Sequence, residues 1–366
     1  MYAIRILTNQ PFRLFLTLSG ISLCVILIMF ILGVYHGVAE GSIEYIKKSN
    51  ADLWVLQKNS TNIMRGTSIM PASYIDVIKE VEQIENVAPV LLFLTNIVVK
   101  GKNATVILTG YRPGDIGGPP IIIKGRKIIS NNEIVLDNSF ATKHKIGIGD
   151  KIKIKDDKLD IVGLSSGTNA FVTQYAFVTL EFEQSIIEFG DLVSFFMVKV
   201  KNSESLLAVK DNIEKKLPGK ISVFTYNQFL KNNIAEMEAG ILPLFYSIAA
   251  IGAVVLAIIL SLILSVNILE RRKDFAIMKI IGSPGSFLDM LILTQALILS
   301  LVSEVIAVLL FFPLVKLIKI VSPEVTTRIN TEHIIYITII ICILSLLSAY
   351  FSSRRIRQIY PLEVFS

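Results

Sequence analysis

The stretch ILERRKDFAIMKIIGSPGSF, residues 268–287, separates two long apolar runs of the sequence. It begins with charged residues, and its apolar residues Phe275, Met278 and Ile281 then recur every three positions. This spacing predicts a short amphipathic helix, and the turn sequence GSPG at 282–285 predicts where that helix ends. A short polar helix between two apolar runs indicates a hairpin of membrane-spanning helices. This stretch therefore decides the class of fold.

The composition agrees with a membrane protein. Hydrophobic residues make up 52% of the chain, and its mean hydropathy is +0.62; soluble proteins of this length rarely reach such values. The net charge is +6, but residues 38–240 carry 24 Lys and Arg against 23 Asp and Glu. The remaining residues carry 12 against 7, mostly at the ends of apolar runs. This placement favours contact with membrane lipids and gives no support for a nucleic-acid partner.

Four segments are long and apolar enough to be membrane helices, at 14–35, 241–268, 287–315 and 334–351. Each has about 18 residues or more, which spans a hydrocarbon core of about 30 Å. The first segment also resembles a signal peptide, because Arg5 and Arg13 precede it. We expect an uncleaved anchor instead, since the apolar run is too long and no clean cleavage site follows it.

The orientation follows from the basic residues beside these segments. If the four helices alternate in direction, nine bases lie on one side: Arg5, Arg13, Arg271, Arg272, Lys273, Lys279, Arg354, Arg355 and Arg357. By the positive-inside rule this side is the cytoplasm. We therefore expect a multi-pass protein of the cytoplasmic (inner) membrane with both termini in the cytoplasm and the polar segment 38–238 outside.

The polar segment has the pattern of an α+β domain. Strands are predicted at 52–57, 87–100, 105–111, 133–137, 151–155, 159–164, 175–180, 195–200 and 221–226. Helices are predicted at 71–84, with Pro71 in the first turn, and at 203–217, with Ser203 as the cap. We expect βαβ-type halves at about 50–120 and 188–235, an inserted β subdomain at about 121–187, and a stalk from 226 toward the second span. Trp54 is expected in the core.

No catalytic or metal-binding constellation is evident. His36, His144 and His333 are isolated in the sequence, and the motifs HExxH, GxSxG and GxxxxGK[ST] do not occur. Gly147 and Gly149 resemble a phosphate loop, but a strand follows them instead of a helix, so a turn is expected. We therefore predict no enzyme activity, no catalytic residues, no bound metal and no cofactor in this chain.

Three polar residues lie within the apolar segments. Glu304 falls near the centre of the third, where a carboxylate costs on the order of 2.5–3.5 kcal/mol on insertion scales. It is either a proton or substrate contact or a hydrogen-bonding residue at a helix or subunit interface, and we favour the second. Asn267 and Gln295 are interpreted as interface residues and not as an ion path.

Four parts of the chain resemble one family. ERRKDFAIMKIIGSPGSFLDMLILTQALIL (270–299) is similar to the signature of the MacB/FtsX-type ABC transporter permeases, through Glu270, Arg271, Ile277, Lys279, Gly282, Ser283, Gln295 and Ala296. NQPFRLFLTLSGIS (9–22) and SRRIRQIYPLEVF (353–365) resemble the family's opening and closing motifs, and the exported segment resembles its periplasmic domain. One departure is SEVIAV (303–308), which stands where the family has a glycine pair and puts tight helix packing there in doubt.

The resemblance implies a permease subunit that dimerises, as a homodimer or a heterodimer, and recruits a separate ABC ATPase subunit that binds the ATP. The stand-alone permease and its large outer domain fit the DevC-like members best. In this family ATP-driven closure of the partner moves a coupling helix, here 270–285, and the outer domain changes position (mechanotransmission). The residues implied in coupling are Glu270, Arg271, Arg272, Phe275, Met278, Lys279 and Gly282. A periplasmic adaptor is a further implied partner.

Taken together, the expected fold has four transmembrane helices in a 1+3 arrangement, with the α+β domain inserted between the first and second. The expected parts are a cytoplasmic segment and first helix (1–37), the extracytoplasmic domain (38–238), three helices with the coupling helix (239–353) and a cytoplasmic tail (354–366). Three alternatives stay open. In the first, the segment 270–285 is a basic amphipathic hairpin that rests on lipid. In the second, the chain is a membrane-anchored sensor or regulator without transport, and in the third it is a proton-coupled carrier that depends on Glu304. The sequence leaves lipid, lipopeptide, peptide and macrolide substrates open.

Overall fold

The structure is a computed structural model that describes residues 11–63, 67–170, 173–187, 190–240, 242–270 and 272–357. It divides into two compact units. The helical unit holds the described residues of 1–36, 243–317 and 327–366, and the α+β unit holds those of 37–242 and 318–326. Arg5, Arg271 and the end of the predicted cytoplasmic tail lie outside the described residues.

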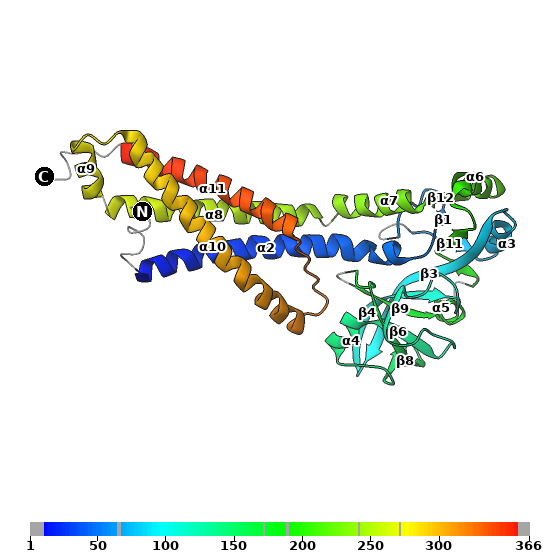
Figure 1. Cartoon of the computed structure of the whole chain (residues 1–366). Helices are drawn as coiled ribbons and strands as arrows, with labels where there is room; N and C mark the ends of the chain where they lie inside the picture. The colour runs from blue at the N-terminus through cyan, green and yellow to red at the C-terminus, as the bar shows by residue number, and fades with distance from the viewer. Residues whose placement is uncertain are drawn as a thin grey trace. The chain divides into compact units, whose positions relative to one another are not determined.

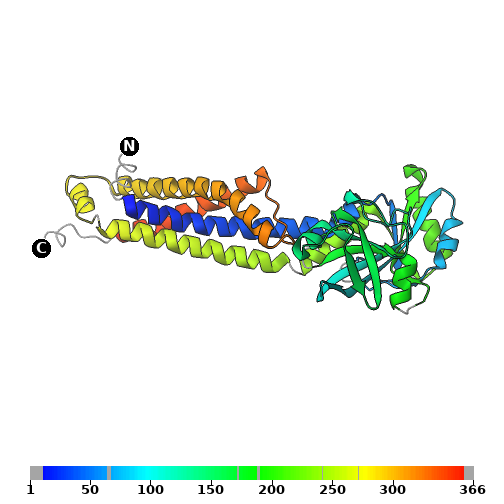
Figure 2. The ribbon, with the colours of Figure 1, turned by 90° about the horizontal axis from the view of Figure 1, so that it is seen from below.

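Four long helices have the length and composition to cross a membrane: α2 (Pro11–Lys48), α8 (Leu242–Glu270), α10 (Gly285–Val321) and α11 (Thr331–Arg357). They confirm the four predicted segments. All four continue further than the apolar runs do, and α2 ends at Lys48 where the sequence predicted 35. In the helical unit the four helices lie side by side, and the short helix α9 (Arg272–Ile280) lies at the end where α2 begins and α11 ends (Figures 1 and 2).

Small residues allow α10 to pack closely in the helical unit. Ala296, Ser300, Ser303 and Ala307 are all fully buried, and they follow one another at four-, three- and four-residue steps, which places them on one face. Small residues on one face let helix backbones approach each other in a membrane. The hydroxyl of Ser22 on α2 donates a hydrogen bond of 2.9 Å to the carbonyl of Ser303. Close packing is therefore achieved without the glycine pair.

Serine residues also join α11 to α8. Ser348 Oγ donates to the carbonyl of Ala257 at 3.0 Å, and one turn further along, Ser352 Oγ donates to the carbonyl of Ser261 at 3.2 Å. A hydroxyl that reaches the backbone of a neighbouring helix requires close contact between the two helices. These two bonds fix the register of α11 against α8.

The α+β unit is built on a ten-stranded sheet in the order β12-β1-β11-β3-β4-β9-β6-β8-β5, with β7 paired to β3 and β8. Its strands are β1 (Leu53–Gln57), β3 (Ile84–Val99), β4 (Lys102–Tyr111), β5 (Ile121–Gly125), β6 (Glu133–Asp137), β7 (Lys151–Ile154), β8 (Asp157–Ser166), β9 (Gln174–Thr179), β11 (Phe195–Val200) and β12 (Ile221–Thr225). β2 (Met70–Pro71) and β10 (Leu192–Val193) form a separate pair. The strands between 121 and 187, predicted as an inserted subdomain, belong to the same sheet as the rest.

The helices of the α+β unit are α3 (Tyr74–Lys79), α4 (Asn138–His144), α5 (Leu180–Ile187), α6 (Leu206–Lys216) and α7 (Tyr226–Ala239), with the 3-10 turn η1 (Ser203–Ser205). Two details of the prediction were wrong. Pro71 pairs in β2, and α3 begins only at Tyr74, because strand pairing with β10 takes this residue out of the helix. Ser205, and not Ser203, occupies the cap position of α6.

The core of the α+β unit includes the C-terminal part of α2. Trp54 is fully buried, as predicted, with its ring centroid 4.4 Å from that of Phe229 and 5.1 Å from that of Phe195. Tyr45 of α2 is buried beside it and donates a hydrogen bond of 2.7 Å to the carbonyl of Gly117. The stalk predicted from 226 is helix α7, which a capping box of Thr225 and Gln228 starts and which stops before α8 begins.

Candidate functional site

Helix α9 is the segment that the sequence singled out for coupling, and it is anchored in the helical unit by its inner face. Phe275 is 4% exposed and Ala276 is fully buried. Phe275 shares an apolar cluster with residues of the flanking helices, Leu264, Ile268, Leu291, Ile292 and Ala296, and with Ala349 of α11. The burial of a phenylalanine side chain contributes about 1.5–3 kcal/mol, so α9 is held against the helices that it connects.

The outer face of α9 and its C-terminal end present three isoleucines. Ile277 is 44% exposed, Ile280 61% and Ile281 78%. The sequence pattern had placed Phe275, Met278 and Ile281 together as the apolar side of an amphipathic helix. In the structure they do not share one side. Phe275 turns inward and Met278 is partly buried against the same cluster, whereas Ile281 is exposed. The exposed apolar surface therefore consists of Ile277, Ile280 and Ile281, which we call the isoleucine face.

Gly282 ends α9 as the sequence predicted. Its φ of +93° lies in the left-handed region, which glycine adopts without the steric cost of a Cβ atom. The backbone N–H of Ser283 donates to the carbonyl of Met278 at 2.9 Å, which is the bond pattern of a Schellman cap. The chain then turns, and α10 begins at Gly285.

The other predicted coupling residues are described to different extents. Glu270 is an exposed residue at the C-terminal end of α8, whereas Arg271 lies outside the described residues. Arg272 begins α9 and Lys279 lies near its end, but their side chains are outside the description, as is that of Asn267 on α8. The role of all these residues in coupling stays a prediction.

Glu304 contacts a neighbouring helix through a hydrogen bond. Its side chain is 5% exposed, and Thr338 Oγ1 on α11 lies 2.5 Å from Glu304 Oε1 and 2.9 Å from the carbonyl of Ile334. The contact fits the interpretation of Glu304 as a hydrogen-bonding residue at a helix interface. Gln295 is also buried, at 4% exposure, on the same helix.

Two of the three histidines, which are isolated in the sequence, lie together in the structure. The rings of His36 on α2 and His333 on α11 stack with 3.7 Å between centroids. Beside them, Tyr246 Oη on α8 lies 2.9 Å from Tyr35 Oη. Among the described residues, no group of three or more His, Cys, Asp or Glu side chains is placed to hold a metal ion.

The end of α10 and the residues that follow it make contacts that the sequence did not suggest. Residues 318–326, which we call the connector, belong to the α+β unit. Lys143 Nζ lies 2.8 Å from Glu324 Oε1, and Asn169 Nδ2 donates to the carbonyl of Glu324 at 3.0 Å. Gly37 of α2 fits so closely against the connector that a Cβ atom there would lie 2.0 Å from the carbonyl oxygen of Thr326. The connector is therefore held against the rest of the α+β unit by polar contacts at Glu324 and by a close steric fit at Gly37.

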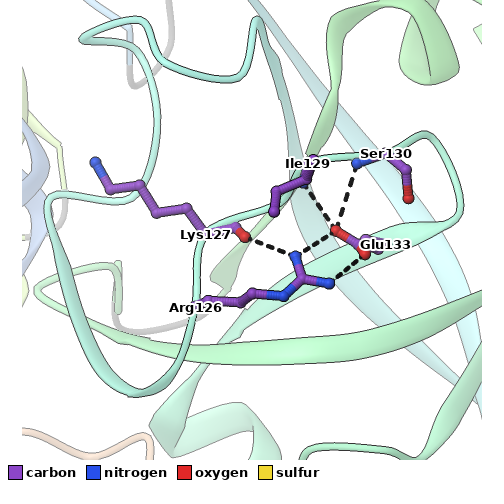
Figure 3. A network of polar contacts seen from close by, with 5 residues as sticks. All are labelled: Arg126, Lys127, Ile129, Ser130 and Glu133. Atoms are coloured by element: carbon purple, nitrogen blue, oxygen red, sulfur yellow. Dashed lines mark hydrogen bonds and ion pairs between the residues drawn. The ribbon is translucent and has the colours of Figure 1, made fainter.

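A polar network in the α+β unit fixes the loop before β6 (Figure 3). The guanidinium of Arg126 forms two hydrogen bonds with Glu133, at 2.7 and 2.5 Å, and the backbone N–H of Ile129 donates to Glu133 at 2.8 Å. The hydrogen bond from Arg126, with support from the Ile129 and Ser130 backbone and against the effect of burial, lowers the pKa of Glu133 to about 2. The bonds of Glu133 all go to residues of the same loop, which indicates a structural role.

The chain matches two protein-family models in sequence order. Residues 14–216 match the MacB-like periplasmic core domain, and residues 246–361 match the FtsX-like permease C-terminal domain. The first match alone covers more than half of the chain. The second includes α9, the isoleucine face and Gly282.

Two curated relatives carry the names of ABC or hemin transport permeases. An ABC transporter permease of Methanocaldococcus jannaschii is 26% identical over 66% of this chain, which spans 64% of that protein, less than two thirds of its length. A Staphylococcus epidermidis protein, named provisionally as the hemin transport system permease HrtB, is 23% identical over 96% of this chain and 95% of its own. The periplasmic region of MacB from Actinobacillus actinomycetemcomitans aligns with a TM-score of 0.41 and 15% identity over 51% of this chain and 94% of its own. On the strength of the two family models, this chain belongs to the MacB/FtsX-like family of ABC transporter permeases.

Proposed function

We propose that this chain is the permease subunit of an ABC exporter in which a separate ATPase subunit binds α9 and moves the α+β unit. The observation that carries the proposal is the two-sided character of α9. One side is embedded in the helical unit through Phe275 and Ala276, and the isoleucine face is exposed. A helix that is anchored on one side and apolar on the other suits the role of a docking element.

The anchoring matters because a docking helix transmits work only if it is fixed to what it moves. The cluster around Phe275 includes residues of α8, α10 and α11. Displacement of α9 by a partner is therefore opposed by apolar contacts on three helices, and these helices have to move with it. Protein interiors transmit such strain because they are close-packed.

The remaining parts of the proposal follow from the family and the charge pattern. The basic residues near α9 support a position of this helix on the cytoplasmic side of the inner membrane, where ATP is available, with the α+β unit on the opposite side. The complete assembly contains two permease chains, as a homodimer or heterodimer, and two ATPase subunits, with a periplasmic adaptor where the cell has an outer membrane. The substrate is released on the outer side and is not specified by this proposal.

The experiment compares changes on the two sides of α9. A double variant with Ile280→Asp and Ile281→Asp places charge on the isoleucine face, and the matched control with Ile280→Leu and Ile281→Leu keeps it apolar. Each of the two variants is co-expressed with an ABC ATPase of the same organism, which is tested as the partner. We expect the aspartate variant to lose co-purification with the ATPase and to lose stimulation of ATP hydrolysis by tenfold or more, since two buried apolar contacts of about 1.5 kcal/mol each exceed this factor. The leucine control keeps both.

Phe275→Ala tests the inner side of α9. We expect this variant to keep the ATPase bound but to reduce export per ATP hydrolysed, because the docking surface remains while its anchor is weakened. Equal ATPase binding and export by the aspartate variant and the leucine control would refute docking at α9. Deletion of the ATPase separates transport from regulation: a transporter loses export, whereas a sensor changes only a downstream activity.

A further inference from the structure

The longest strand of the α+β unit, β3, has one edge that is only partly paired. β3 has 16 residues and pairs with β4 from Val90 to Val99 along one edge. Its other edge pairs with β11 from Ile84 to Val90 and with β7 at Val98. Between Leu92 and Val98, no strand in the described part of the chain pairs with this second edge, which we call the open edge.

The backbone groups that face the open edge follow from the bonds at its start. The N–H of Ser194 donates to the carbonyl of Val90 at 2.8 Å, and the N–H of Leu92 donates to Ser194 Oγ at 2.9 Å. In a strand, alternate residues direct their N–H and C=O groups to the same side. Leu94 and Asn96 therefore direct theirs to the open edge, where they are suited to accept an added strand.

A cavity of about 340 Å³ opens at the same place. Leu91, Leu92, Phe93 and Leu94 all line it, together with Ile69, Ile187, Leu192 and Phe195. Successive side chains of a strand point to opposite faces, so a cavity that touches four successive residues reaches around the strand edge. This volume is within the range of about 300–1,000 Å³ that is typical of ligand pockets.

The lining of this cavity is chemically simple. Among the described residues, no charged side chain lines it. Its two serines are engaged within the domain: Ser68 Oγ accepts from the N–H of Gln57 at 2.9 Å and donates to the carbonyl of Ser194 at 2.5 Å, while Ser194 Oγ accepts from Leu92. The wall therefore presents mainly apolar groups. Its rim is exposed, with Ile69 and Phe93 at 40% and Leu94 at 60%.

We propose that an extended segment of a partner protein adds to the open edge of β3 as a short strand and inserts an uncharged apolar side chain into the cavity. The main-chain groups of Leu94 and Asn96 bind the backbone of the segment, and the cavity selects its side chain. In strand addition, main-chain hydrogen bonds supply affinity and side-chain pockets supply specificity. The contact does not depend on the proposed docking of an ATPase at α9.

The limits of the open edge determine the kind of occupant. The five residues from Phe93 to Ile97 extend over about 16 Å at 3.3 Å per residue, so the added strand is short. β11 and β7 bound the open edge at its two ends. Strand β3 of a second copy carries its own β11 and β7 on the same edge, so two such edges collide before they pair. A loop or tail that is extended over a few residues fits.

The test uses the full-length chain in detergent micelles and the probe peptide acetyl-Thr-Val-Leu-Val-Thr-amide. Two control peptides match it, one with aspartate in place of leucine and one with an N-methyl group on the leucine nitrogen. We expect saturable binding of the probe only, with slower hydrogen exchange in the segment that contains Leu94 and Asn96. N-methylation removes one main-chain hydrogen bond, and a loss of about tenfold in affinity corresponds to a bond of about 1.4 kcal/mol.

Two protein variants locate the contact. Leu94→Pro removes the N–H at the open edge and leaves the ladder to β4 intact, and Leu94→Ala is its matched control, which keeps the N–H. Ile69→Asp places a charge at the cavity rim, and Leu207→Asp does the same at a position on α6 that is 66% exposed. We expect Leu94→Pro and Ile69→Asp to weaken probe binding at least tenfold relative to their controls, with the fluorescence of Trp54 as the check on folding.

Each remaining outcome overturns the proposal. Absence of saturable binding up to millimolar peptide rules out strand addition at this edge. Equal binding by all three peptides, or by Leu94→Pro and Leu94→Ala, shows that neither the cavity nor the main chain recognises the probe. Transport of the bound probe by the assembled complex shows a substrate site and refutes a partner site.

Discussion

Glu183 provides the sharpest test of the packing of the α+β unit. It lies on α5, its side chain is fully buried, and neither carboxyl oxygen has a hydrogen-bond partner among the described residues. Gly110 on β4 lies close to this carboxyl group, because a Cβ atom at Gly110 would lie 2.5 Å from Glu183 Oε2. Burial raises the pKa of Glu183 well above its ordinary value of 4.5, and the Gly110 backbone acts in the opposite direction.

The raised pKa makes stability depend on pH in a definite direction. The folded chain keeps the proton of Glu183 at a pH where the unfolded chain releases it. The contribution of this group is therefore most favourable below pH 4.5 and declines as the pH rises toward the folded pKa. One proton changes the free energy of unfolding by about 1.4 kcal/mol per pH unit, so this contribution falls by at most that amount for each pH unit above the unfolded value of 4.5.

Glu183→Gln removes this dependence because an amide does not titrate in this range. The chain has a single tryptophan, Trp54, which is buried in the α+β unit, so its fluorescence during urea unfolding in micelles reports on this unit alone. We expect the difference in unfolding free energy between Glu183→Gln and the natural chain to rise with pH by the amount given. Glu181→Gln, an exposed change on the same helix, is the control and should leave the pH dependence unchanged.

The result that refutes this reasoning is a constant difference between Glu183→Gln and the natural chain above pH 4.5. The amide also lacks partners in this site, so it adds a constant offset of about 1–3 kcal/mol. The slope with pH, and not the offset, is therefore the measurement that decides whether the buried carboxyl group is protonated.

Three further predictions concern other contacts. Gly110→Ala forces a Cβ atom into the buried carboxyl oxygen 2.5 Å away, and we expect it to lower the unfolding free energy of the α+β unit by about 1–3 kcal/mol in the same fluorescence assay. Glu133, whose pKa is lowered to about 2, stabilises the folded state above pH 4.5, so stability falls as the pH drops from 4.5 toward 2, and Arg126→Gln should flatten this acid limb. Gly37→Ala places a Cβ atom 2.0 Å from a connector carbonyl, whereas Gly20→Ala on the same helix meets nothing within 4 Å. We expect only Gly37→Ala to reduce bismaleimide cross-linking between cysteines that replace Lys143 and Glu324. Equal cross-linking in the Gly37→Ala and Gly20→Ala variants would contradict the close fit at Gly37.

Local sequence patterns predicted the elements whose boundaries are set locally. The turn sequence at 282–285 ends α9 because glycine can take the left-handed conformation that the cap needs, and this requirement can be read from neighbouring residues alone. Strands β6 and β11 were predicted to the residue because each is a short run of buried residues. Pro71 was misplaced because its neighbour in the structure, Leu192, is 121 positions away along the chain.

The candidate sites depended more strongly on distant contacts. The periodicity of α9 is compatible with Phe275 on either side, and only its contacts with α8, α10 and α11 turn it inward. The stack of His36 and His333 and the ion pair of Lys143 and Glu324 join residues that a single sequence gives no reason to associate. Glu183 has the appearance of an ordinary helix charge in LEFEQSII, and its burial follows from the packing of α5 on β4.

Under the proposed function, work done at α9 would have to reach the α+β unit through the chain that joins them. The chain leaves α9 through Gly282 and continues as α10, which reaches Val321 within the connector. The connector is held to the α+β unit by Glu324, and the C-terminal part of α2 is held there by Tyr45. A helix resists compression along its axis because its backbone hydrogen bonds lie nearly parallel to that axis. Pro313 removes one such bond from α10, so the segment between α9 and the connector is most easily bent at this residue.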